Sequence, residues 1–199
     1  MADDKSGREK QAADDDKRQR ERDMEAAQRR GDEAEPPIDD AATEALEDAL
    51  EPLTFPATGR EIVDAAGDQE LESTARVYTV ADLIPDADAE AFDAPATVRE
   101  RVRRPAVATA MKRVVEAAAD LPNAEFGRSQ REAFERTFRA VSDIDEIDDD
   151  EGVRAVADWA VGRIAEGETV PGSRDLRRRA AKHCRTHGYE VRDDEWLGV

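Results

Sequence analysis

The sequence has few of the features that usually reveal a function. Its 199 residues include one cysteine, Cys184, which excludes an internal disulfide. No apolar run reaches the 18 residues of a membrane span, and the charged N-terminus does not resemble a signal peptide, so we expect a soluble, cytoplasmic protein without membrane contact. The motifs GxGxxG, Walker A and GxSxG are missing too. No nucleophile, base and orienting group stand out together, so we expect no enzyme, no cofactor and no small-molecule substrate.

Lysine is also scarce, with five residues against 25 arginines, whereas 49 residues are Asp or Glu. The resulting net charge is −19 and the pI is about 4.5. Such a charge repels itself in dilute buffer, but about 1 M salt shortens the Debye length to roughly 3 Å and screens the repulsion. Because the acids are spread over the whole chain, the composition is typical of a protein from a salt-saturated, halophilic cytoplasm.

The alternative explanation of high charge and low apolar content is disorder. The position of the large apolar residues separates the two explanations, because the 34 Leu, Ile, Val and Phe residues all lie at or beyond Ile38. We therefore expect a disordered, charged tail over residues 1–37 and a folded remainder. The expected fold is mainly α with a minor β component, in two small helical modules.

Local signals predict an α-rich first module over residues 38–121. Thr58 and Glu61 have the spacing of a capping box, and Thr79 is placed to cap a one-turn helix. Residues 69–78 predict a strand or a β-hairpin. Pro105 separates two further helices, of which the second has an amphipathic face formed by Val107, Met111, Val114, Val115 and Ala118.

A second, helical module is expected over residues 126–199. Ser129 and Glu132 again have capping-box spacing, and Ser173 is expected to cap a basic helix over 173–187 that Gly188 ends. Beyond it we expect a short strand over 189–191 and a C-terminal aromatic tail that docks through Trp196. Apolar residues at helical spacing predict the core of this module: Phe134, Phe138, Val141, Val153, Val156, Ala160 and Ile164.

Two basic islands, residues 98–113 and 172–187, interrupt the acidic sequence, and each carries a net charge of +5. They predict either a surface that binds another protein or a second copy, or a nucleic-acid interface in which the helix 173–187 resembles a recognition helix. A third explanation is that their arginines pair with acids of the same chain. Concentrated salt weakens phosphate binding steeply, so we favour an interaction or regulatory protein over a nucleic-acid binder. The candidate binding residues are Arg174, Arg177, Arg178, Lys182, Arg185, Arg101, Arg103 and Arg104.

Two possible metal motifs fail on inspection. His183 and His187 are four residues apart on one helix, but Cys184 is the only further soft ligand and no HExxH or CxxC accompanies them. The acidic stretch 143–151 does not fit an EF-hand, because Ile147 or Glu151 falls on an essential loop position in the two registers. We expect no metal, with Cys184 packed inward and the aromatic residues, including Trp159, in the core.

Four segments carry a resemblance to a known group of proteins: FPATGREIVDAAGDQELES, RRPAVATAMKRVVEAA, GRSQREAFERTFRA and VPGSRDLRRRAAKHCRTHGYEVRDDEWLGV. They resemble segments of an uncharacterised haloarchaeal family, and the likeness extends over nearly the whole chain, including the MADDKSGREKQA head. This resemblance implies a salt-adapted cytoplasm and the module limits given above. It implies no activity and assigns no role to any residue.

Overall fold

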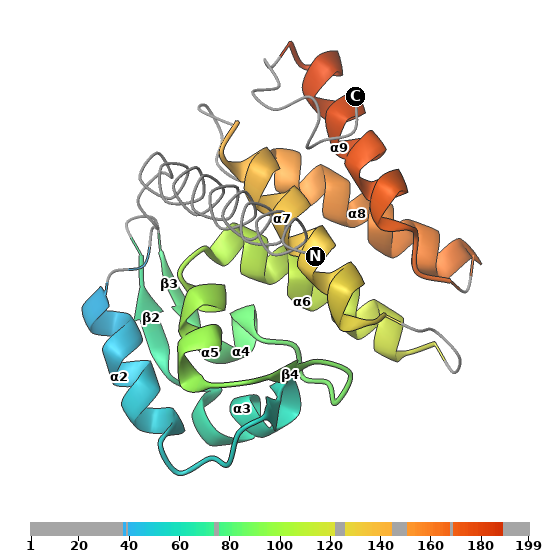
Figure 1. The fold of residues 1–199 in the computed structure, drawn as a ribbon. Coiled ribbons are helices and arrows are strands. Elements are labelled where there is room, and N and C mark those ends of the chain that lie inside the picture. The colour runs from blue at the N-terminus through green and yellow to red at the C-terminus, as the bar shows by residue number, and fades with distance from the viewer. Residues whose placement is uncertain are drawn as a thin grey trace, which may run out of the picture. The chain divides into compact units, whose positions relative to one another are not determined.

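The computed structural model of the chain describes residues 38, 40–73, 76–121, 126–144, 151–167 and 169–188. The chain divides into two units, Met1–Glu35 and Pro36–Val199, and every described residue belongs to the second. Helices predominate in this unit and its strands are short (Figure 1). The prediction of a mainly α fold with a minor β component is therefore confirmed.

The N-terminal half of the described chain contains short elements that alternate between helix and strand. In chain order they are α2 (Asp40–Leu50), β1 (Ala57–Thr58), α3 (Gly59–Ala66), β2 (Glu70–Glu72), β3 (Val77–Thr79), α4 (Val80–Leu83), β4 (Ala91–Phe92) and α5 (Pro95–Val102). Their buried side chains form one hydrophobic cluster that includes Leu46, Ile62, Leu71, Leu83 and Val98.

Two capping boxes begin the short helices α3 and α4. The box at Thr58 and the cap at Thr79 were predicted, whereas the part of Asp82 in the second box was not. The Thr58 hydroxyl accepts from the Glu61 amide at 3.2 Å, while the Glu61 carboxylate accepts from the Thr58 amide at 2.7 Å. Thr79 and Asp82 repeat this arrangement at the start of α4. Each box satisfies amide donors that a first helical turn leaves without partners, which allows such short helices to form.

The strands form two separate antiparallel pairs. β2 pairs with β3 and Leu71 lies opposite Tyr78, which confirms the predicted hairpin. β1 pairs with β4, so that Ala57 lies opposite Phe92. The second pair was not predicted, because two strands of two residues each, 34 residues apart, have no local periodic signal.

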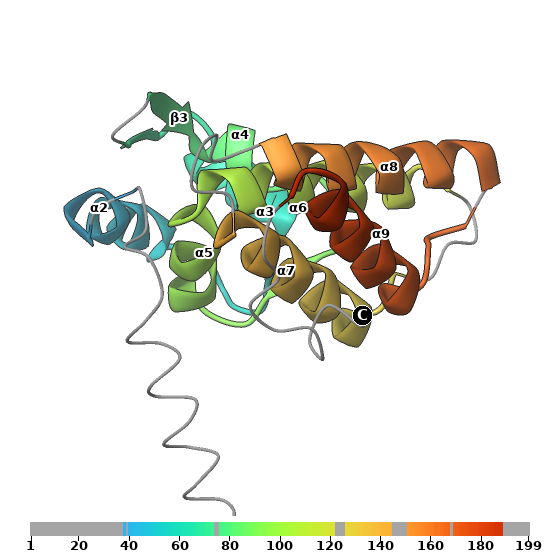
Figure 2. The same cartoon turned by 90° about the horizontal axis from the view of Figure 1, so that it is seen from above.

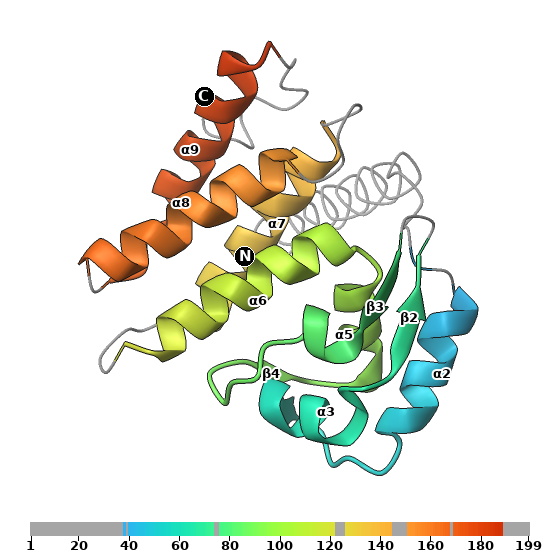
Figure 3. The ribbon, with the colours of Figure 1, turned by 180° about the vertical axis from the view of Figure 1, so that it is seen from behind.

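Helix α6 (Pro105–Ala119) connects two hydrophobic clusters (Figure 3). Pro105 occupies its first position, so the helix restarts there as predicted. Ala108 belongs to the first cluster, whereas Val107, Met111 and Val114 belong to the second. The predicted boundary between the two modules, at residues 121–126, comes after α6. The buried residues of this helix nevertheless belong mostly to the second cluster.

Three helices complete this second cluster: α7 (Arg128–Ser142), α8 (Glu151–Gly167) and α9 (Ser173–Thr186). Phe134 and Phe138 of α7 are fully buried and meet edge to face, with ring centroids 6.5 Å apart. Two predicted caps are wrong, because Ser129 lies inside α7 and Ser173 is already the first residue of α9. The extended residues Gly127 and Gly172 take the cap positions, without a side-chain hydrogen bond.

Several predictions concern residues outside the described ranges: the disordered tail over 1–37, the acidic linker beyond Ile144, the strand over 189–191 and the docking role of Trp196. Within the described ranges, no helix has both the length and the apolar character needed to cross a membrane.

Candidate functional site

The first basic island, residues 98–113, is neutralised by acids of the same chain. Arg99 contacts Glu47 of α2 at 3.2 Å, and Arg103 contacts Glu100 one turn earlier at the same distance. Later in the island, Lys112 pairs with Glu116 and Arg113 pairs with Asp158 of α8. Arg104 is half-buried at the N-cap of α6. For this island, internal pairing is the arrangement that the structure shows.

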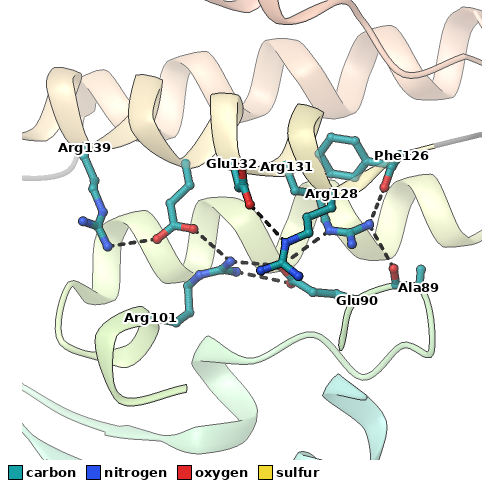
Figure 4. A network of polar contacts seen from close by, with 9 residues as sticks. Ala89, Glu90, Arg101, Phe126, Arg128, Arg131, Glu132 and Arg139 are labelled. Atoms are coloured by element: carbon teal, nitrogen blue, oxygen red, sulfur yellow. Dashed lines mark hydrogen bonds and ion pairs between the residues drawn. The ribbon is translucent and has the colours of Figure 1, made fainter. Parts of the chain in front are cut away.

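Arg101 lies in the interior of the protein, with 7% of its surface exposed (Figure 4). Its two terminal nitrogens donate to the two Glu90 oxygens at 3.3 and 2.9 Å, and Nη2 also donates to Glu135 Oε2 at 3.0 Å. Burial acts to lower the pKa of Arg101, but the charges and hydrogen bonds of both carboxylates outweigh it and raise the pKa above its usual value. Arg101 therefore cannot meet an outside partner, which corrects its place among the candidate surface residues.

Neighbouring residues hold this network in position (Figure 4). Arg131 of α7 donates hydrogen bonds to the carbonyl oxygens of Ala89 and Phe126 and lies 3.8 Å from Glu90. Arg139 donates to the second Glu135 oxygen at 3.0 Å. The network joins α5 and the segment before β4 to α7, so its role is to connect the two clusters.

The second basic island differs, because four of its six cations are exposed. It forms α9, which packs beside α7 and α8 (Figure 2). At 100° per residue, the four exposed cations fall within about 80° around the helix axis. We call this set the α9 stripe: Arg174, Arg178, Lys182 and Arg185, all exposed. Arg178 lies 3.7 Å from Asp175, and among the described residues no other ion pair involves the stripe. Of the two basic islands, the one at residues 172–187 is therefore the one whose cations are available for binding.

The apolar face of α9, opposite the α9 stripe, explains why the stripe is exposed. Leu176, Ala180 and Cys184 are buried against α7 and α8, as predicted, and Ala181 joins them. Burial of this apolar seam forces the basic side chains outward. Gly188, with a φ of +76°, follows the end of the helix in the left-handed conformation that the sequence predicts.

A hollow of about 750 Å³ lies between α8 and α9, and we refer to it as the α8/α9 hollow. Half-buried Trp159, Val170 and Pro171 give it apolar surface. The lining includes four cations, Arg163, Arg178, Arg179 and Lys182, and one acid, Asp175. The hollow thus combines apolar contact area with an excess of positive charge.

Two further candidates flank the stripe. Arg177 and Arg179 are half-buried, and their Nε atoms are buried without a hydrogen-bond partner among the described residues. Arg179 lines the hollow, whereas Arg177 does not. A buried guanidinium donor without a partner is costly, so a carboxylate near Arg179 would gain a hydrogen bond there.

Sequence reasoning assigned Trp159 to the core and did not single out Arg163 or Arg179 as site residues. Trp159 packs at the edge of the second cluster and also lines the hollow. Arg163 lies on α8 and Arg179 on α9, so only the packing of the two helices brings them together. No local sequence pattern contains that information.

The two histidines near the end of α9 lie against each other. His183 and Cys184 are buried, and the His183 and His187 rings stack with centroids 4.1 Å apart. His187 Nδ1 lies 2.9 Å from the His183 carbonyl oxygen. Among the described residues, no group of three or more His, Cys, Asp or Glu side chains is arranged to hold a metal ion.

Comparison with known proteins characterises only the first part of the chain. No curated protein and no solved structure matches the chain significantly. Residues 40–114 match the model of a family of unknown function, DUF5789, and this match ends within α6, before the helices that form the α8/α9 hollow.

Proposed function

We propose that this protein is a non-enzymatic interaction protein that binds an acidic segment of another protein chain at the α9 stripe and the α8/α9 hollow. The observation that supports this proposal is the contrast between the two islands. Five of the six cations of residues 98–113 form ion pairs with acids of the chain, whereas Arg174, Lys182 and Arg185 have no ion pair among the described residues.

The apolar part of the hollow supports a partner that also contributes an apolar side chain. Charge attraction alone weakens in concentrated salt, since the Debye length falls to roughly 3 Å at 1 M. Burial of apolar surface against Trp159, Val170 and Pro171 is not screened by salt. Tryptophan and arginine are also the residues that most often dominate binding energy at protein interfaces. We therefore assign the partner a segment with acids flanking a Leu, Phe or similar residue.

The lining also supports binding rather than catalysis. Apart from Asp175, its charged groups are arginines and a lysine, side chains that form charge-assisted hydrogen bonds with carboxylates. The polar lining contains Thr169 but no Ser, Cys or His that could act as an activated nucleophile with a base.

We place the protein in the cytoplasm of a salt-accumulating cell. The net charge of −19 would repel an acidic partner over long distances in dilute buffer. In concentrated salt that repulsion is screened, and short contacts in the hollow determine binding.

A charge-matched pair of variants tests the proposed function. The stripe variant carries Arg178→Gln, Lys182→Gln and Arg185→Gln, and the control carries Arg60→Gln, Arg128→Gln and Arg136→Gln, three exposed arginines on α3 and α7. Partners are captured with the tagged full-length protein in molar KCl and cross-linked, and each recovered protein is then titrated in purified form. We expect the stripe variant to lose at least tenfold in affinity and the control to bind as the wild type does. Equal loss in both variants, or in neither, would contradict the proposal.

A nucleic-acid interface is the second candidate, because α7, α8 and α9 pack pairwise against one another and α9 presents the basic face. Recognition helices of helix-turn-helix proteins are exposed in a similar way. Four phosphate contacts would give a log–log salt slope of about −3.6. Anisotropy titrations with duplex DNA and RNA from about 0.1 to 1 M KCl distinguish the two functions. A steep slope that the stripe variant reduces supports nucleic acid, while no binding at any salt concentration excludes it.

A further inference from the structure

A second basic hollow, which the candidate site does not include, lies where β3, α6 and α8 meet (Figure 3). We refer to it as the α6/α8 hollow; its volume is about 440 Å³. It uses none of the residues of the α8/α9 hollow. Its lining consists of Arg76, Tyr78, Ala106, Thr109, Ala110, Arg113, Arg154 and Ala157.

Small side chains create the space in this hollow. Ala106 and Ala110 lie one helical turn apart on α6, and Ala157 lies on α8, which packs along α6. Tyr78, which is 7% exposed, supplies an aromatic wall from the hairpin. The lining combines these apolar surfaces with three arginines and Thr109, and its volume lies within the range of about 300–1,000 Å³ that is typical of small-molecule sites.

The charged lining of the α6/α8 hollow is all of one sign. Arg113 is neutralised by Asp158, which lies 2.6 Å away. The Arg76 guanidinium stacks 4.1 Å from the centre of the Tyr78 ring, and among the described residues neither Arg76 nor Arg154 has an ion pair. Arg76 acts on the nearby Asp82 carboxylate only through its field, without a direct contact. Two guanidiniums around one small cavity are thus not engaged in an ion pair within the part of the chain that the structure describes.

We propose that the α6/α8 hollow binds a small organic phosphate ester. A phosphate monoester carries about −1.5 to −2 charges at pH 7, which matches the two guanidiniums that form no ion pair among the described residues. A single carboxylate would leave one of them without a counter-charge. Planar guanidiniums bind phosphate oxygens with paired hydrogen bonds, and the Thr109 hydroxyl offers another donor. The organic part of the ligand lies against Tyr78 and the alanines.

The proposed site bridges the two hydrophobic clusters. Tyr78 belongs to the first cluster, whereas Ala110 and Ala157 belong to the second. A ligand that contacts both would stabilise the folded chain, because it binds the native state and not the unfolded one. This site does not depend on the function proposed for α9, so either proposal can fail alone.

Calorimetric titration of the full-length protein in molar KCl tests the site, with AMP and glycerol 3-phosphate as esters and inorganic phosphate and acetate as comparisons. We expect both esters to bind more tightly than inorganic phosphate, and acetate not to bind. Arg76→Gln and Arg154→Gln should each weaken the esters about tenfold or more, because each removes a charge-assisted hydrogen bond. The control Arg163→Gln changes the same charge on α8 but lies in the other hollow and should bind as the wild type does.

Three results would overturn the proposal. We expect a Kd of about 0.1 mM for the esters. The first result is that neither ester binds at about 10 mM, a concentration roughly a hundredfold above this Kd. The second is that Arg163→Gln weakens binding as much as Arg154→Gln does, which would indicate a general charge effect. The third is that inorganic phosphate binds as tightly as the esters, which would show that the organic part of the ester contributes nothing to the affinity. Thermal unfolding of each variant without ligand shows whether a loss of binding reflects a loss of folding.

Discussion

The Arg101 guanidinium donates two hydrogen bonds to the Glu90 carboxylate, from Nη2 to Oε1 at 2.9 Å and from Nη1 to Oε2 at 3.3 Å. Both side chains are buried, with 7% and 5% of their surfaces exposed. Glu135 approaches the same guanidinium from α7, so two acids surround one buried cation. This arrangement makes each charged group dependent on the others, because a buried charge without a partner is strongly unfavourable.

Arg101→Ala should therefore destabilise the protein by about 3–5 kcal/mol, since it leaves Glu90 buried without its counter-charge. The matched control is Arg128→Ala, which removes an exposed arginine paired with Asp93 and Glu132 and should lower stability much less, because exposed ion pairs are screened by water and salt. Urea denaturation at a fixed KCl concentration measures both values. Similar costs for the two variants would show that the buried network does not support the fold.

Sequence reasoning identified the elements whose causes are local. The capping box at Thr58, the cap at Thr79 and the restart of the helix at Pro105 depend on residues a few positions apart, and the structure contains all three. The Ser129 cap failed because Gly127 lies extended just before α7 and accepts the first helical hydrogen bonds, so the helix begins at Arg128.

The two basic islands show why site prediction was incomplete. They have the same net charge and similar composition, yet the first meets Glu47, Glu90, Glu135 and Asp158 from distant segments. The second packs through Leu176 and Cys184 and turns its cations outward. Tertiary packing determines which arginines find internal partners, and one sequence does not contain that pairing in any local pattern.

Thr58, which caps α3, and Ser129, which lies inside α7, give a direct comparison. Thr58→Ala removes the hydroxyl that accepts from the Glu61 amide, and should cost about 1 kcal/mol of unfolding free energy. Ser129→Ala, in contrast, replaces an exposed serine inside α7 with a better helix former and should change stability by at most about 0.5 kcal/mol. Chemical denaturation of both variants provides the measurement, and an equal cost would mean that Ser129 does act as a cap.

The Asp82 capping box should make stability depend on pH. Hydrogen bonds from the Thr79 backbone and side chain, with smaller contributions from Arg76 and Lys112, lower the pKa of Asp82 below its ordinary 3.8. Because the pKa is lower in the folded state, this stabilisation is complete above pH 3.8 and is lost as the pH falls through the folded-state pKa. We expect Asp82→Asn to be less stable than the wild type at pH 6 and to approach it below pH 3.8. Urea denaturation between pH 3 and 6 measures this convergence, and a stability difference that stays constant over that range would contradict the prediction. Asp64→Asn, at an exposed acid on α3, makes the same charge change outside a capping box and is measured alongside.

Two glycines should respond to alanine with opposite signs. Gly162 lies within α8, and a Cβ added there would meet no atom within 4 Å. Gly162→Ala should stabilise the protein by about 0.5–1 kcal/mol, because alanine has less freedom to lose when the helix forms. Gly188 has a φ of +76°, where a Cβ is strained, so Gly188→Ala should destabilise by about 1–2 kcal/mol. Thermal unfolding distinguishes the two, and a gain in both variants would mean that the turn at Gly188 relaxes without cost.

The acidity of the chain leads to a prediction about salt. With a net charge of −19, raising KCl from about 0.1 to 1 M shortens the Debye length from roughly 10 to 3 Å and should raise the unfolding temperature steeply. The cost of Arg101→Ala should change much less over the same range, because buried pairs are screened weakly. Parallel unfolding curves for the wild type and this variant at each KCl concentration separate surface repulsion from the internal network. If the unfolding temperature of the wild type does not rise with KCl, repulsion between the surface acids does not limit the stability of the fold, and the acidic composition is not an adaptation to salt.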